Sequence, residues 1–204
     1  GDRIRFTFGM REITIVNVTD DNTRVQRMLA GDFDGTVIPP QLAAGFPESA
    51  GFTVVSNPSA DWRSVVLPAK DPVAGDPEVR QALNRAVDRT AIVQTVLAGH
   101  GIAASTPFSP VFSTYYDPAA EFADDPDAAR AILDQAGWVP GPDGIRVKDG
   151  QRLHFEIWVA PFYQVSQPVL ELLQSQWRKA GVELNINSAS LTEYQSIQAE
   201  RRDT

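Results

Sequence analysis

Cysteine is absent from the 204-residue sequence, and histidine occurs only at His100 and His154. Without thiols the chain has no disulfide bonds, no thiolate catalysis and no cysteine-ligated zinc or iron–sulfur site. The two histidines would form a metal site only together with a carboxylate, and no metal-binding motif places such groups together. We therefore expect no metal site, and we expect both histidines to be solvated side chains on the surface.

Basic residues are in the minority, because 18 Lys and Arg stand against 26 Asp and Glu and give a formal net charge of -8. Phosphate binding needs a concentrated Lys and Arg surface, so this balance argues against a nucleic-acid partner. No run of 18 apolar residues is present that could span a membrane as a helix, and we expect no signal peptide within these residues. The chain starts without Met and stops on a charged tail, from which we expect a segment excised from a longer protein.

Known catalytic motifs are missing as well. The chain has no Gly-x-Ser-x-Gly, no Ser-x-x-Lys and no glycine-rich phosphate loop. Its acidic clusters lie at expected helix starts or turns, where Asp accepts hydrogen bonds from backbone N–H groups, and this role is favoured over glycosidic or calcium chemistry. The clusters are Asp20-Asp21, Asp32 with Asp34, and Asp124-Asp125 with Asp127. We expect that the protein is not an enzyme; a hydrolase would need a reactive residue outside this chain.

The patterns that are present predict a mixed α/β fold, with helices packed on small sheets. Alternating or β-rich runs predict strands over residues 3–8, 12–18, 52–55, 62–67, 145–148, 151–159 and 182–187. Helical spacing of apolar residues predicts helices that begin near residues 22, 76, 88, 125, 167 and 191. Pro, Asp and Gly accumulate over residues 68–75, which we interpret as a crossing between two structural units.

Local signals mark the ends of several of these elements. Asp76-Pro77 and Asp125-Pro126 each combine an N-cap residue with proline in the first helical turn, and Asp88 is the N-cap of a further helix. Asp149-Gly150 stands between two strand-like runs, which is the signal of a type I′ hairpin. These signals depend on the local backbone alone.

Aromatic and amide side chains gather between the strand that ends near Val159 and the helix that begins near Gln167. The carboxyl end of a strand and the start of the next helix form a common place for ligands in α/β proteins. The candidate ligand-binding residues are Trp158, Phe162, Tyr163 and Gln164, with Trp62 as a further candidate. The alternative, that Trp158 and Phe162 are core residues at a strand end, stays open.

Segments along nearly the whole chain resemble, in order and spacing, the extracytoplasmic solute-binding proteins of family 5, which serve ABC importers of peptides and nickel. Residues 76–89 (DPEVRQALNRAVDR) are similar to the family hallmark D-P-x-V-R-Q-A-L-x-x-A-I-D-R. Residues 127–138 (DAARAILDQAGW) resemble its A-x-x-L-L-x-E-A-G-W segment, and residues 21–34 and 173–182 resemble two further segments. These motifs are mostly structural and identify the family without identifying the ligand.

The resemblance implies a two-lobed, periplasmic-binding-protein-like fold of type II, the Venus flytrap, in which lobe closure buries the solute. It places residues 1–58 in part of lobe one and residues 59–204 in an incomplete lobe two. It implies capture of a peptide or similar small solute outside the cytoplasmic membrane, in the periplasm or at the cell surface on a lipid-anchored protein, and delivery to ABC permease subunits. It implies no cofactor. The alternative is a solute-sensing receptor of the same fold that is not coupled to transport.

Two positions depart from the family pattern. In the family, the loop matching residues 160–168 faces the cleft, and some peptide binders place a basic residue there to hold the ligand carboxylate. This chain has Gln164, and it reads Val65-Val66-Leu67-Pro68-Ala69 where the family usually has an apolar residue followed by Asn-Thr. The resemblance therefore leaves solutes other than short peptides open.

Overall fold

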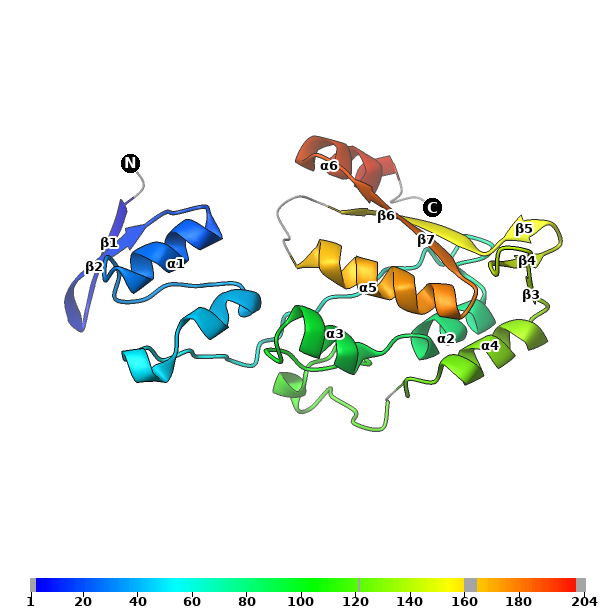
Figure 1. Ribbon diagram of the computed structural model, residues 1–204, viewed down its shortest axis with the longest axis horizontal. Coiled ribbons are helices and arrows are strands. Elements are labelled where there is room, and N and C mark those ends of the chain that lie inside the picture. Colours follow the sequence, from blue (N-terminus) through cyan, green and yellow to red (C-terminus); the bar gives the residue numbers. More distant parts are fainter. Residues whose placement is uncertain (1–2, 121, 160–164, 201–204) are drawn as a thin grey trace. The chain divides into compact units, whose positions relative to one another are not determined.

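The computed structural model describes residues 3–120, 122–159 and 165–200 of the chain (Figure 1). The chain divides into two compact units, Gly1–Asn57 and Pro58–Thr204, each of which we describe by itself. Residues 68–75, where the composition suggested a crossing, lie inside the second unit and form turns there, with Val73 and Ala74 buried. The assignment of the two units to two lobes stays a prediction.

The first unit is a hairpin with one helix and two short 3₁₀ turns. Strands β1 (Arg3–Phe8) and β2 (Met10–Val16) pair antiparallel, and α1 (Asp21–Leu29) begins where the Asp20 side chain accepts a hydrogen bond from the Thr23 N–H at 2.7 Å. The turns are η1 (Pro40–Gly45) and η2 (Glu48–Ala50). Among residues 9–57, whose burial is described, the buried apolar side chains are Val25, Ala43 and Phe46.

Aspartate caps fix the helix starts of the second unit as the sequence predicts. The helices α2 (Pro77–Arg85), α3 (Arg89–Val96) and α4 (Pro126–Gln135) follow Asp76, Asp88 and Asp125, whose side chains accept backbone N–H bonds at 2.7–2.8 Å. The 3₁₀ turn η3 (Pro110–Phe112) lies between α3 and α4. Capping is therefore confirmed as the role of these carboxylates.

The described residues of the second unit also form two small sheets. Strands β3 (Val139–Pro140), β4 (Arg146–Lys148) and β5 (Gln151–Arg152) pair antiparallel, with Asp149 (φ 52°) and Gly150 (φ 79°) in the left-handed conformations that a type I′ turn needs. Strands β6 (His154–Val159) and β7 (Glu183–Ser188) pair parallel and are joined by α5 (Ser166–Lys179). The helix α6 (Leu191–Glu200) follows β7.

Two strand predictions were wrong and one strand is divided. Residues 52–55 and 62–67 form no strand, because among the described residues their backbones find no neighbouring strand to pair with. Val65 and Leu67 still pack against the core, while Val66 between them is 82 % exposed. The strand predicted over residues 151–159 is interrupted at Leu153, which is buried. The residues before Leu153 form β5 and pair with β4, whereas those after it form β6 and pair with β7.

The core of the second unit lies between α2, α4, α5 and the inner face of β6 and β7. Val79 and Leu83 are buried there, as the family motif predicts, and Trp177 is 3 % exposed. The buried Gln176 amide joins α5 to the start of α3, since it accepts from the Asp88 N–H at 3.1 Å and donates to the Asp88 carbonyl at 3.2 Å. One polar side chain in the core therefore satisfies both backbone groups of a residue 88 positions away.

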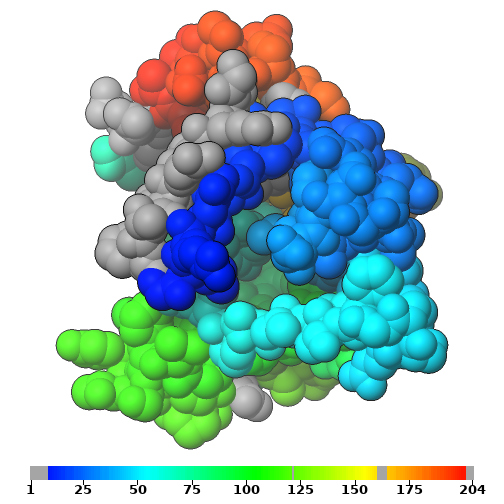
Figure 2. Space-filling model, turned by 90° about the vertical axis from the view of Figure 1, so that its left-hand side faces the viewer, coloured from blue at the N-terminus to red at the C-terminus, as the bar shows by residue number. Residues whose placement is uncertain are grey.

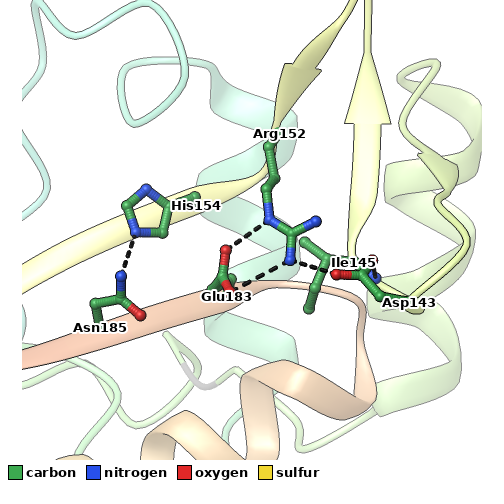
Figure 3. A network of polar contacts seen from close by, with 6 residues as sticks. All are labelled: Asp143, Ile145, Arg152, His154, Glu183 and Asn185. Atoms are coloured by element: carbon green, nitrogen blue, oxygen red, sulfur yellow. Dashed lines mark hydrogen bonds and ion pairs between the residues drawn. The ribbon is translucent and has the colours of Figure 1, made fainter.

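A network of charged side chains ties the β4–β5 hairpin to the start of β7 (Figure 3). The Arg152 guanidinium donates to Glu183 Oε2 at 2.6 Å and to Asp143 Oδ2 at 2.5 Å, and Asp143 also accepts from the Ile145 N–H at 3.1 Å. The hydrogen bond from Arg152 lowers the pKa of Asp143 to about 2 and also lowers the pKa of Glu183. Arg152 itself has a raised pKa because of Glu183 and Asp143.

This network should make the protein less stable in acid. Because the folded-state pKa values of Asp143 and Glu183 lie below their unfolded values, their stabilisation is present above about pH 4 and is lost as the pH falls towards 2. We expect the urea midpoint to fall between pH 5 and pH 2.5, and Arg152→Gln to remove part of that fall. Arg178→Gln removes the same charge from an exposed position of α5 and is the control. If the urea midpoint of Arg152→Gln fell with pH as much as that of the wild type, the acid sensitivity would not come from the ion pairs of Arg152.

Candidate functional site

The carboxyl ends of β6 and β7 lie together, because the two strands are parallel. Trp158 is opposite Asn187, and Val159 is opposite Ser188, in the register of the pair. The Ala189 N–H donates to the Val159 carbonyl at 3.2 Å, which extends the pairing by one step before the chain enters α6. In Figure 1 α6 stands beyond this end of β7.

An open hollow of about 310 Å³ lies at this edge, between the end of β6 and α6. Its lining residues come from β6, from the end of β7 and from one side of α6: Trp158, Ser188, Ala189, Thr192, Glu193, Ser196 and Ile197. The volume is at the lower end of the roughly 300–1,000 Å³ that small-molecule pockets have. The hollow is the candidate functional site of the second unit.

Trp158 reaches this hollow because of strand alternation. Phe155 and Ile157 pack against the core, so His154, Glu156 and Trp158 lie on the opposite face of β6. Trp158 is half-buried there. The structure thus places it at the sheet edge and outside the core cluster, and ligand binding by it stays a prediction.

The other predicted site residues are not brought to the hollow. Phe162, Tyr163 and Gln164 lie outside the described residues. Trp62 is 47 % exposed in a segment without regular secondary structure and does not line the hollow. Of the histidines, His100 is exposed as expected, whereas His154 is half-buried and forms a hydrogen bond with the Asn185 amide at 2.9 Å (Figure 3).

The α6 side of the hollow was missed from the sequence, although Ser190-x-x-Glu193 is a readable capping box. The Ser190 N–H donates to Glu193 Oε2 at 2.8 Å, and the Glu193 N–H donates to Ser190 Oγ at 3.3 Å. Hydrogen bonding with Ser190, first with its side chain and then with its backbone N–H, lowers the pKa of Glu193, which favours the carboxylate form. The capping box therefore fixes a negative charge at the rim of the hollow.

The described residues lack two features. No group of three or more His, Cys, Asp or Glu side chains there could hold a metal ion. Among the helices of the same residues, none combines the length and apolar character that a membrane crossing requires.

Comparison with known proteins gives the family. The family model for bacterial extracellular solute-binding proteins, family 5 Middle, matches residues 9–203. The chain belongs to this family. Its resemblance to the family hallmark and the predicted mixed α/β, periplasmic-binding-protein-like fold are thereby confirmed. Proteins of this family are extracellular solute-binding proteins.

Individual relatives share about a third of their length with this family 5 chain. Protein XP55 of Streptomyces lividans is 40 % identical over 181 residues, which are 89 % of this chain and 33 % of that protein. The glutathione-binding protein GsiB of Salmonella typhimurium is 30 % identical over 179 residues, 86 % of this chain and 32 % of GsiB. The structure of NikA from Brucella suis in complex with Fe(III)-EDTA has a TM-score of 0.78 at 31 % identity, over 96 % of this chain and 40 % of NikA.

Proposed function

We propose that the protein is the substrate-binding component of an ABC importer, which captures a peptide or similar small solute outside the cytoplasmic membrane and delivers it to the permease. The observation that carries the proposal is the hollow at the joined carboxyl ends of β6 and β7, with Trp158 in its wall. Family membership supports the solute-binding role, and names such as glutathione-binding for one relative show that solutes differ within the family.

In this proposal the protein binds and releases its solute without chemistry. Trp158, Phe162, Tyr163, Gln164 and Trp62 are the proposed ligand-binding residues. Residues 1–58 form part of lobe one and residues 59–204 an incomplete lobe two of a protein that is membrane-anchored at full length and works in the periplasm or at the cell surface. Aromatic side chains and backbone groups supply most of the affinity, as in other apolar pockets with a few polar groups.

Trp158→Ala should weaken solute binding by about 10- to 30-fold, because aromatic residues in a binding site contribute the largest share of the binding energy. The solute is first found by thermal-shift screening of the natural full-length protein against di- and oligopeptides, nickel chelates and oligosaccharides, since a ligand of the native state raises the melting temperature. Isothermal titration calorimetry then compares wild type and variant.

Tyr115→Ala is the matched control, because Tyr115 is an aromatic residue that is 70 % exposed and lies outside the hollow. Its affinity should stay within about twofold of the wild type. Equal affinities of Trp158→Ala and the wild type would exclude the hollow as the solute-binding site. Chemical turnover of the bound solute would exclude a protein that only binds and releases it. Solute binding without any loss of uptake in a deletion strain would favour the sensing receptor.

A further inference from the structure

The hollow carries negative charge and no positive charge on its described walls. Glu193 is the one charged residue among the lining residues of the hollow, and its capping hydrogen bonds hold it as a carboxylate. The sequence places no Lys, Arg or His in residues 155–167 or 183–199, the stretches that run into and out of the sheet edge. Arg152, the nearest arginine before β6, is already paired with Asp143 and Glu183 at the opposite end of the strands. Arg201 and Arg202 follow residue 200 in the sequence and lie outside the described residues. Among the described lining residues, an anionic group in the hollow would meet a carboxylate without a compensating cation.

Hydroxyl groups supply most of the hydrogen-bonding capacity of the hollow. Thr192 and Ser196 are four residues apart on α6 and so lie on one face of that helix, while Ser188 ends β7. All three are exposed, and in Figure 2 the atoms of α6, orange to red, stand at the molecular surface. A hydroxyl both donates and accepts hydrogen bonds, which suits a solute that has the same dual character.

Glu193 and Trp158 add a hydrogen-bond acceptor and an aromatic ring to the hydroxyl groups of the hollow. Oε2 of Glu193 accepts from the Ser190 N–H, and a carboxylate has further acceptor sites that can receive an O–H group. Trp158 lines the β6 side of the hollow, and an indole ring system has a broad apolar face. A sugar ring has the matching form, with an apolar face of C–H groups and an edge of hydroxyls.

We propose that the part of the solute seated in this hollow is an uncharged sugar ring, so that the solute is an oligosaccharide. The ring lies against Trp158, and its hydroxyls bond to Thr192, Ser196 and Glu193. This inference rests on the solute-binding part of the proposed function, and it replaces the peptide named there with an oligosaccharide. A solute with a free carboxylate at this position, such as glutathione or a short peptide held by its C-terminus, is disfavoured by Glu193.

The test measures binding to the natural full-length protein by isothermal titration calorimetry at neutral pH. The probes are cellotriose, maltotriose and chitotriose, with trialanine and glutathione as the carboxylate-bearing comparison. We expect one of the trisaccharides to bind, and both carboxylate-bearing probes to bind at least about 100-fold more weakly, which corresponds to two steps of tenfold in affinity.

The variant Thr192→Val removes one hydroxyl from the hollow at nearly constant volume and should weaken trisaccharide binding by about tenfold. Thr90→Val is its matched control, because Thr90 is likewise the second residue of a helix, α3, and is exposed. Its affinity should stay within about twofold of the wild type.

The outcomes separate this inference from the function on which it rests. Tighter binding of trialanine or glutathione, weakened by Trp158→Ala, would overturn the sugar assignment and leave the solute-binding function standing. Trisaccharide binding that Thr192→Val and Thr90→Val affect equally would overturn the placement of the ring in the hollow. Binding of no probe in this series, together with no hit in the wider thermal-shift screen, would overturn both.

Discussion

Replacing Trp177 with alanine should lower the free energy of unfolding of the second unit by about 3–5 kcal/mol, the cost of removing a large aromatic side chain from a packed core. Trp177 is 3 % exposed, and its ring meets Phe155 of β6 edge-on, with 6.0 Å between the ring centroids. Urea denaturation followed by far-UV circular dichroism measures the change, because that signal does not depend on the tryptophan that is removed.

The hydrogen bond of the indole adds to the effect. Nε1 of Trp177 donates to the Leu83 carbonyl at 3.2 Å, near the end of α2, so one side chain of α5 contacts both the sheet and that helix. In Trp177→Ala the buried carbonyl loses its side-chain partner, which costs about 1–3 kcal/mol when water cannot replace it. Trp177→Phe keeps a ring and loses only the donor, so it should fall between the wild type and Trp177→Ala.

Trp62→Ala is the control for Trp177. Trp62 is 47 % exposed and belongs to no helix or strand, so its removal should change the free energy of unfolding by less than about 1 kcal/mol. A loss as large as that of Trp177→Ala would mean that the core does not centre on α5.

Features encoded by a few neighbouring residues were predictable from the sequence. Asp76, Asp88 and Asp125 start helices because a carboxylate two or three residues ahead of free N–H groups needs no distant partner. The Asp149-Gly150 turn is equally local, since it requires only two residues that tolerate positive φ.

Features that need a distant partner were not predictable in the same way. Residues 62–67 have the composition of a strand, but a strand also needs a neighbour, and propensity alone cannot supply one. The division of the run 151–159 at Leu153 likewise depends on β7, some 30 residues further along the chain. In the candidate site, Trp158 was predictable because ligands of α/β proteins often bind at the carboxyl ends of strands. The lining residues on α6 were not predictable, because they reach the hollow only through the parallel pairing of β7 with β6.

Gly181→Ala should destabilise the second unit by about 3 kcal/mol or more, for two reasons that can be separated. Gly181 has φ +87°, where a residue with a side chain costs about 1–2 kcal/mol. A Cβ atom at this position would also lie 2.7 Å from Cγ of Arg146. Arg146 is 3 % exposed, so its side chain has little room to move away.

Displacing Arg146 would break the contacts that connect three parts of the second unit. Its guanidinium donates to the Ala180 carbonyl at 2.9 Å and to the Trp138 carbonyl at 2.5 Å, and it forms an ion pair with Asp134. The Arg146 N–H also donates to the Gly181 carbonyl at 2.8 Å. Because buried carbonyls left without donors cost about 1–3 kcal/mol, the clash should add to the strain of the backbone.

Gly150→Ala isolates the backbone part of the cost. Gly150 has φ +79° in the β4–β5 turn, and no atom lies within 4 Å of the position of an added Cβ. This variant should lose only about 1–2 kcal/mol, and the difference from Gly181→Ala measures the clash with Arg146.

The double variant Gly181→Ala/Arg146→Ala tests whether the cost of Gly181→Ala depends on the Arg146 side chain. Arg146→Ala alone is destabilising, but it removes the three atoms nearest to the added methyl group at position 181, which are Cγ, Cδ and Nε of Arg146. In this background Gly181→Ala should therefore cost about as much as Gly150→Ala does. The coupling between neighbouring sites that such a cycle detects is about 0.5–3 kcal/mol. Strictly additive losses in urea denaturation would show that Arg146 does not restrict position 181. Since Gly181 leads through Val182 directly into β7, a coupled result would also mean that the buried arginine fixes the start of the strand whose far end forms the hollow.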